Sequence, residues 1–149
     1  MNVSTQNRRA LEAMVKQSMD EGWIDQNPDQ ILVNMQDDLA QMYIAAGAVR
    51  AGEDVDWEAQ VEHFLQERKQ QLTKMLCDPK KPGLQPRFKK LLGKDDLSGL
   101  LNNLAVTLLP IVVFNQEVEI AKYFPLTVKL AFYVVRVGLD KWCTDCKAA

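Results

Sequence analysis

Residues 97–142 read LSGLLNNLAVTLLPIVVFNQEVEIAKYFPLTVKLAFYVVRVGLDKW, and this stretch decides the fold. It contains two apolar runs, residues 100–114 and 124–139, joined by a polar connection that begins Asn115-Gln116-Glu117. Both runs are rich in Val and Ile, as buried strands are. They are nevertheless longer than typical strands and have Leu, Ala and Lys interspersed. The stretch therefore predicts an apolar C-terminal helical hairpin.

The second helix of this hairpin carries its basic residues on one side. Lys122, Lys129 and Arg136 are spaced seven residues apart, which is about two helical turns, so they project from the same side. The other positions are apolar on two faces, a pattern typical of a helix that is buried on most sides. We expect the three basic residues to form its only solvated edge.

Three environments suit such a hairpin: the protein core, a lipid bilayer or the surface of another protein. A stable membrane span needs about 20 apolar residues without charge. Asn102, Asn103 and Pro110 interrupt the first run, and Lys129 and Arg136 interrupt the second, at a high cost in a bilayer centre. We therefore expect a core hairpin that keeps one face for another protein. A membrane-acting helical effector, which inserts only after a conformational change, is an alternative.

The first two helices of the chain have clear start signals. Ser4 is suited to cap a helix from about Thr5 to Glu21, and Asn27 precedes Pro28 at the start of the second. Gly47 is a suitable C-terminal cap for the second helix. The apolar residues of this helix follow the alternating steps of three and four of a coiled-coil seam, at Leu32, Met35, Leu39, Met42 and Ala46.

The third helix is expected to begin near Asp54 or Asp56 and to end near Leu76. A Pro/Lys-rich basic linker follows over residues 78–94, within which a short helix is expected at residues 87–92.

Prolines and caps delimit the last two helices. Asp95 or Ser98 is expected to cap the first of them, and Pro110 to kink or end it. Pro125 is expected to open the final helix, which should run to about Trp142.

Length and composition favour one domain, residues 1–149, built as an all-α bundle of five to six helices. The 149 residues are 47% hydrophobic and 26% charged, which are ordinary values for a globular protein. Within that domain we distinguish an acidic three-helix part (1–77), the linker (78–94) and an apolar helical part (95–149). Residues 1–9 are polar and no apolar segment of a signal peptide follows them. Together with an odd number of cysteines, this predicts a cytoplasmic protein.

The net charge of −2 conceals an uneven distribution. Residues 1–73 have six basic and thirteen acidic side chains, a balance of −7, whereas residues 74–149 have twelve and seven, a balance of +5. The two halves could attract each other within one chain or between copies. The basic residues of the linker could also contact a nucleic-acid backbone, and these candidates are Lys80, Lys81, Arg87, Lys89, Lys90 and Lys94.

The sequence offers little for catalysis. Cys143 and Cys146 form a CxxC pair that supplies only two of the four ligands of a zinc site, and it follows a helix rather than opening one. His63 precedes Cys77 by fourteen residues on one predicted helix, so the two cannot share a metal ion. The paired Asp37-Asp38 and the acids near residue 56 are typical of solvated and capping positions. We therefore predict no enzyme, no cofactor and no metal site.

These patterns favour a non-enzymatic intracellular interaction or assembly subunit that self-associates or joins a larger protein complex. Its contacts would be its apolar C-terminal helices and its oppositely charged halves. A nucleic-acid backbone-binding subunit that uses residues 80–94 is the main alternative, and no small-molecule substrate is indicated. The residues expected to bind a partner are Lys122, Lys129, Phe132, Val135, Arg136 and Trp142.

Overall fold

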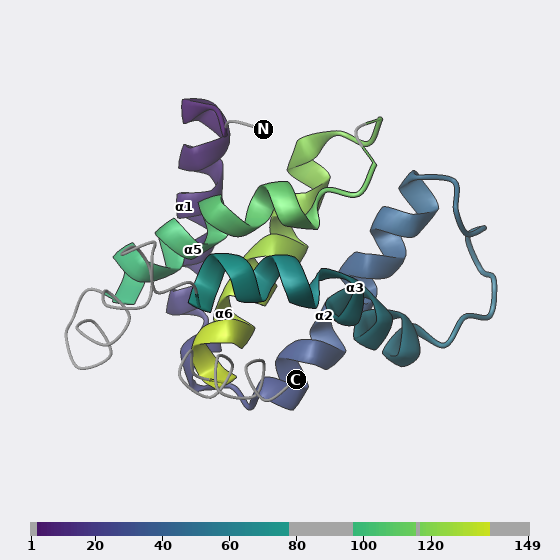
Figure 1. The fold of residues 1–149 in the computed structure, drawn as a ribbon, viewed down its shortest axis with the longest axis horizontal. Coiled ribbons are helices and arrows are strands. Elements are labelled where there is room, and N and C mark those ends of the chain that lie inside the picture. The colour runs from purple at the N-terminus through teal and green to yellow at the C-terminus, as the bar shows by residue number, and fades with distance from the viewer. Residues whose placement is uncertain (1–2, 78–96, 116, 138–149) are drawn as a thin grey trace.

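In the computed structural model, the described residues are 3–77, 97–115 and 117–137, and their secondary structure is helical throughout (Figure 1). These ranges contain no strand, which confirms the all-α prediction. The five α-helices are α1 (Thr5–Asp20), α2 (Pro28–Ala45), α3 (Trp57–Cys77), α5 (Leu97–Val112) and α6 (Phe124–Val137). Two short 3-10 helices, η1 (Trp23–Asp25) and η2 (Ile120–Tyr123), precede α2 and α6.

Side-chain caps start the first three helices where the sequence predicts them. The Ser4 hydroxyl accepts a hydrogen bond of 3.1 Å from the Asn7 N–H, and the side-chain Oδ1 of Asn27 accepts one of 2.9 Å from the Asp29 N–H. Asp56 accepts from the Ala59 N–H at 3.2 Å, so α3 begins after the second of its two candidate caps. Each cap satisfies a backbone donor that the helix itself leaves unpaired.

The end of α2 is a Schellman motif. Gly47 has a φ of +75°, a left-handed conformation that favours glycine. Its N–H donates to the Ile44 carbonyl at 3.1 Å, and the Ala48 N–H donates to the Tyr43 carbonyl at 3.0 Å. The predicted role of Gly47 as a C-terminal cap is therefore confirmed.

Pro110 and Pro125 lie close to the helix ends that they were predicted to mark. Pro110 lies inside α5, which ends two residues later at Val112. Pro125 is the second residue of α6 rather than its first. Ser98 lies within α5 and is therefore not its cap. Asp95, the short helix expected at residues 87–92 and the expected end of α6 near Trp142 lie outside the described residues.

Helix α6 runs through the middle of the molecule and packs against α1, α2 and α5 (Figure 1). Helix α1 has its main contacts with α5 and α6, although it is more than 75 residues away from them in the sequence. Helices from the N-terminal and C-terminal parts of the chain thus pack against one another.

The buried side chains follow the helical spacing of the apolar runs. In α5 they recur at steps of three and four, and in α6 they cover more than one face. The members with no solvent exposure include Leu101, Leu104, Leu108 and Val112 of α5 and Leu126, Leu130, Phe132 and Val134 of α6. None of the helices in the described residues combines the length and apolarity that crossing a membrane would need.

Aromatic side chains hold the connection between α5 and α6 in place. The Tyr123 hydroxyl donates to the Asn115 carbonyl at 2.7 Å and accepts from the Asn115 N–H at 3.1 Å. The ring of Phe114 lies edge-on to Tyr123, with centroids 5.5 Å apart, and to Tyr43 of α2, with centroids 5.2 Å apart. Tyr43 also contacts Trp57 of α3. The connection is therefore held against both α2 and α3.

Replacing Asn27 with Ala should lower the free energy of unfolding by about 1 kcal/mol, because the Asp29 N–H loses its acceptor. Urea unfolding followed by circular dichroism measures the change. Asn27→Asp retains an acceptor and serves as the control. Equal stability of the Ala and Asp variants would contradict the assigned cap.

Candidate functional site

An ion pair joins α2 to α6. The Lys129 ammonium donates a hydrogen bond to the Asp38 carboxylate, although the two residues are 91 positions apart in the chain. Only 14% of the Lys129 side chain and 16% of the Asp38 side chain is exposed. A pair at this depth is weakly screened by solvent.

Trp23 of η1 also contacts the Lys129 side of this ion pair. The Lys129 ammonium lies 5.4 Å from the centroid of the Trp23 ring, within the range of a cation–π interaction. The same ring packs edge-on against Phe132, with centroids 5.9 Å apart, and its N–H donates to Glu21 at 3.1 Å. The ammonium thus has a carboxylate and an aromatic face as neighbours.

Burial raises the pKa of the Asp38 carboxyl above its ordinary value of 3.8. The hydrogen bond and positive charge of Lys129 oppose this effect, whereas the negative charge of Asp37 adds to it. Desolvation is the largest of these influences on the pKa, so the pair stands in a poorly hydrated position.

The prediction that Asp38 is solvated like its neighbour Asp37 is wrong. Asp37 is exposed, whereas Asp38 is mostly buried. Asp38 lies three residues after Met35 and four before Met42, and both methionines are buried core residues. That spacing placed its carboxylate beside the apolar seam and indicated that it needs a partner.

An open groove of about 420 Å³ adjoins the ion pair between α2 and the start of α6. Lys122 is its exposed cation, and Ile44 is 36% exposed at its apolar wall. The lining side chains include Asp38, Gln41, Met42, Ile44, Lys122 and Pro125.

The structure buries three of the six residues that were predicted to bind a partner. Lys122 is exposed, but Lys129 is largely buried in its ion pair and does not form a solvated edge. Phe132 has no exposure and Val135 has 7%, because α1, α2 and α5 all pack against α6. These apolar side chains therefore offer no surface to a partner in this structure.

The remaining predicted site residues cannot be placed. The side chain of Arg136 and all of Trp142 lie outside what the structure describes, as do Cys143 and Cys146. The same holds for the candidate nucleic-acid contacts Lys80, Lys81, Arg87, Lys89, Lys90 and Lys94.

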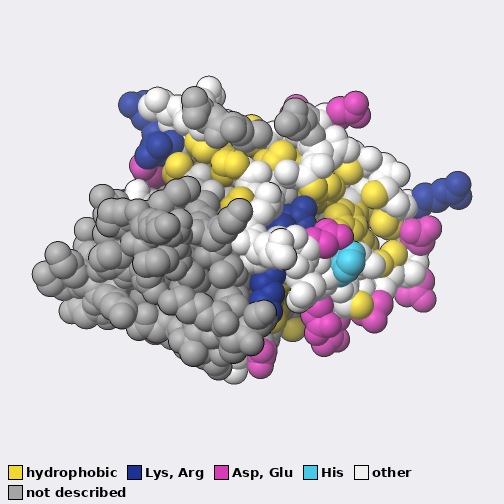
Figure 2. Space-filling model, in the orientation of Figure 1, with side chains coloured by type: hydrophobic (Ala, Val, Ile, Leu, Met, Phe, Trp, Pro, Cys, Tyr) yellow, Lys and Arg dark blue, Asp and Glu magenta, His cyan; other side chains and the backbone are white. Residues whose placement is uncertain are grey.

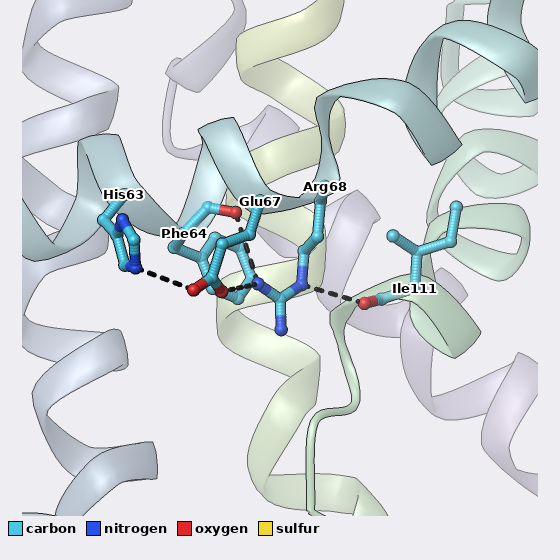
Figure 3. A network of polar contacts seen from close by, with 5 residues as sticks. All are labelled: His63, Phe64, Glu67, Arg68 and Ile111. Atoms are coloured by element: carbon cyan, nitrogen blue, oxygen red, sulfur yellow. Dashed lines mark hydrogen bonds and ion pairs between the residues drawn. The ribbon is translucent and has the colours of Figure 1, made fainter.

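A second polar network, centred on Arg68 of α3, has a structural role (Figure 3). The Arg68 Nε–H donates to the Ile111 carbonyl at 3.0 Å, and Ile111 is the last residue but one of α5. The guanidinium also lies 3.9 Å from the centroid of the Phe64 ring, and burial lowers the Arg68 pKa. Arg68 thus supplies a donor and a positive charge to the C-terminal end of α5.

His63 belongs to the outer part of this network. Its Nε2 lies 2.7 Å from Glu67, which in turn pairs with Arg68 at 3.4 Å, and the His63 side chain is 63% exposed (Figure 3). The His63 side chain is therefore a largely solvated member of the network. Within the described ranges, no three His, Cys, Asp or Glu side chains lie together in a way that could hold a metal ion.

Acidic side chains form an exposed surface at the connection between α2 and α3 and along the first half of α3. Twelve of the thirteen acids in residues 1–73 are exposed, Asp38 being the exception. Figure 2 shows acidic groups along the right and lower edges of the molecule. We define the acidic surface as Glu53, Asp54, Asp56, Glu58 and Glu62. None of these five forms an ion pair with another residue that the structure describes.

Comparison of the chain with protein family models, with curated proteins and with solved structures found no match.

Replacing Lys129 with Met should destabilise the protein by about 2 kcal/mol, because the buried Asp38 carboxylate then lacks its partner. The double variant Asp38→Leu/Lys129→Met should recover most of this loss, since it buries neither charge. Urea unfolding of both variants and of Asp38→Leu alone measures the coupling between the two sites. Additive effects of the two replacements would contradict the ion pair.

The raised pKa of Asp38 predicts a specific pH dependence. The stability that it contributes is fully present below the pKa of the unfolded chain and is lost as the pH rises through the higher pKa of the folded state. The free energy of unfolding of the native protein minus that of Asp38→Asn should therefore fall as the pH rises above 3.8. Urea unfolding at a series of pH values measures this difference. A difference that grows with pH would show that Lys129 outweighs desolvation.

Proposed function

We propose that this protein is a non-enzymatic assembly subunit that self-associates through its oppositely charged halves. The acidic surface of one copy binds the basic segment, residues 80–94, of the next. The observation that carries this proposal is the exposure of twelve of the thirteen acids in residues 1–73. Oppositely charged surfaces attract over several ångströms and guide association.

The charges of the two halves are poorly matched by contacts within the described residues. Among these residues, the Asp38–Lys129 pair is the ion pair that links residues 1–73 to residues 74–149. It uses a single one of the thirteen acids. The five carboxylates of the acidic surface remain available to a cationic partner, and the chain itself supplies six basic residues within residues 80–94.

The helical hairpin has a supporting role in this proposal. We infer that the helices form one bundle in which α5 and α6 are the apolar hairpin. The contact between α5 and α6 and the burial of both helices support this arrangement. Because these faces are already covered, the association should depend mainly on charge and should weaken as salt screens it.

Light scattering of the full chain, over a wide concentration range, tests the proposal. In about 50 mM NaCl the mass should keep growing beyond the chain mass of 16.9 kDa, because head-to-tail contacts do not close on themselves. In about 500 mM NaCl the growth should largely disappear. A strict monomer at high concentration and low salt would refute the proposal.

Charge reversal locates the contact. Glu58→Lys/Glu62→Lys should abolish the continuing growth in mass, since it reverses two charges of the acidic surface. Glu12→Lys/Asp20→Lys makes the same change in net charge on α1 and should assemble as the native chain does. Equal effects of the two double variants would contradict a specific acidic surface. A monomer that instead binds labelled RNA at low salt would favour the nucleic-acid alternative.

A further inference from the structure

The outer face of α2 carries the two large hydrophobic side chains that are exposed within the described residues. Val33 is 52% exposed and Ile44 is 36% exposed. They are eleven residues apart, which is about three helical turns, so both point to the same side of α2. The opposite side of α2, with Met35 and Leu39, is buried in the core.

Two further residues connect these hydrophobic side chains into a short seam. Asp37 is exposed and Ala40 is half-buried, and both lie between Val33 and Ile44 on the same face. The steps along Val33, Asp37, Ala40 and Ile44 are four, three and four, which is the spacing of the contact positions of a coiled coil. We call these four residues the outer seam.

We propose that the outer seam binds the outer seam of a second copy, with the two α2 helices antiparallel about a two-fold axis. The midpoint of the seam lies between residues 38 and 39. The two-fold rotation about this midpoint places Val33 of one copy opposite Ile44 of the other, and Asp37 opposite Ala40. Each of these two residue pairs occurs twice in the dimer. The four residues are therefore complementary to themselves, as a symmetric interface requires.

Charge complementarity favours a second copy over an unrelated apolar partner. Asp37 lies toward the flank of the seam that also bears Gln41, and exposed Lys122 lines the groove on that flank. A two-fold axis perpendicular to the plane of the paired helices keeps this flank on the same side of both copies. Asp37 of each copy then faces Lys122 of the other, and the small Ala40 leaves space for the carboxylate.

This contact rests on the proposed self-association and adds a second, independent surface to it. The outer seam makes a closed dimer, whereas the acidic surface makes an open chain of copies. The two contacts use different residues, so each can be removed while the other is kept.

Complementary charge variants test the seam in the Glu58→Lys/Glu62→Lys background, which lacks the other proposed contact. As its concentration rises, the mass of this double variant should approach twice 16.9 kDa and grow no further. Asp37→Lys and Lys122→Glu should each weaken dimerisation about tenfold, because each reverses two symmetric contacts. An equal mixture of the two variants should restore the dimer, since both contacts of the mixed pair are attractive. Analytical ultracentrifugation measures all three samples.

Matched controls separate this effect from a change in net charge. Glu12→Lys and Lys16→Glu make the same charge changes on exposed positions of α1 and should leave the dimer intact. The proposed contact between outer seams would be overturned if the Glu58→Lys/Glu62→Lys variant is strictly monomeric. It would also be overturned if the mixture of the Asp37→Lys and Lys122→Glu variants fails to dimerise. Salt-sensitive growth of the native chain would then still support the proposed function. If the Glu58→Lys/Glu62→Lys variant forms a dimer and the mass of the native chain also stops at that of a dimer, only the head-to-tail contact is rejected.

Discussion

Covering α6 is the constraint on which the rest of the structure depends. Because this helix is apolar on more than one face, no single neighbour can remove it from water, and α1, α2 and α5 each bury part of it. The position of α1 follows from this need, since its main contacts are with helices from the other end of the chain. The Pro110 end of α5 and the Tyr123–Asn115 bonds then fix where the chain turns back into α6.

Local features of the fold were predictable, whereas contacts across the chain were not. Ser4, Asn27, Asp56 and Gly47 act within four residues of themselves, so their roles can be inferred from neighbouring positions. Lys129 shows the limit of this approach. Its seven-residue spacing from Lys122 predicted a shared side of one helix, but Lys122 lies in η2, before α6 begins. The spacing also gave no sign that Asp38, 91 positions away, would pair with Lys129.

The same limit applies to the candidate site. The uneven charge could be counted from the sequence, but which acids remain exposed depends on how the helices pack. The apolar faces of α6 were expected to serve a partner, and burial by three helices removes them from that role. The surfaces that remain exposed on the described residues include the polar and acidic outside of α2 and α3, where Val33 and Ile44 are the exposed large hydrophobic side chains. The proposed contacts therefore shift from the apolar faces of α6 to the acidic surface with its basic partner, residues 80–94, and to the outer seam with Lys122.

The long separation between Asp38 and Lys129 also bears on how the chain acquires its fold during synthesis. Helices α1 and α2 leave the ribosome well before α6 exists, and their buried faces have α6 as a principal partner. Until residue 129 emerges, the carboxylate of Asp38 has water in place of the Lys129 ammonium. Folding of these helices is consequently completed only after α6 has been made, with long-range closure as its late step.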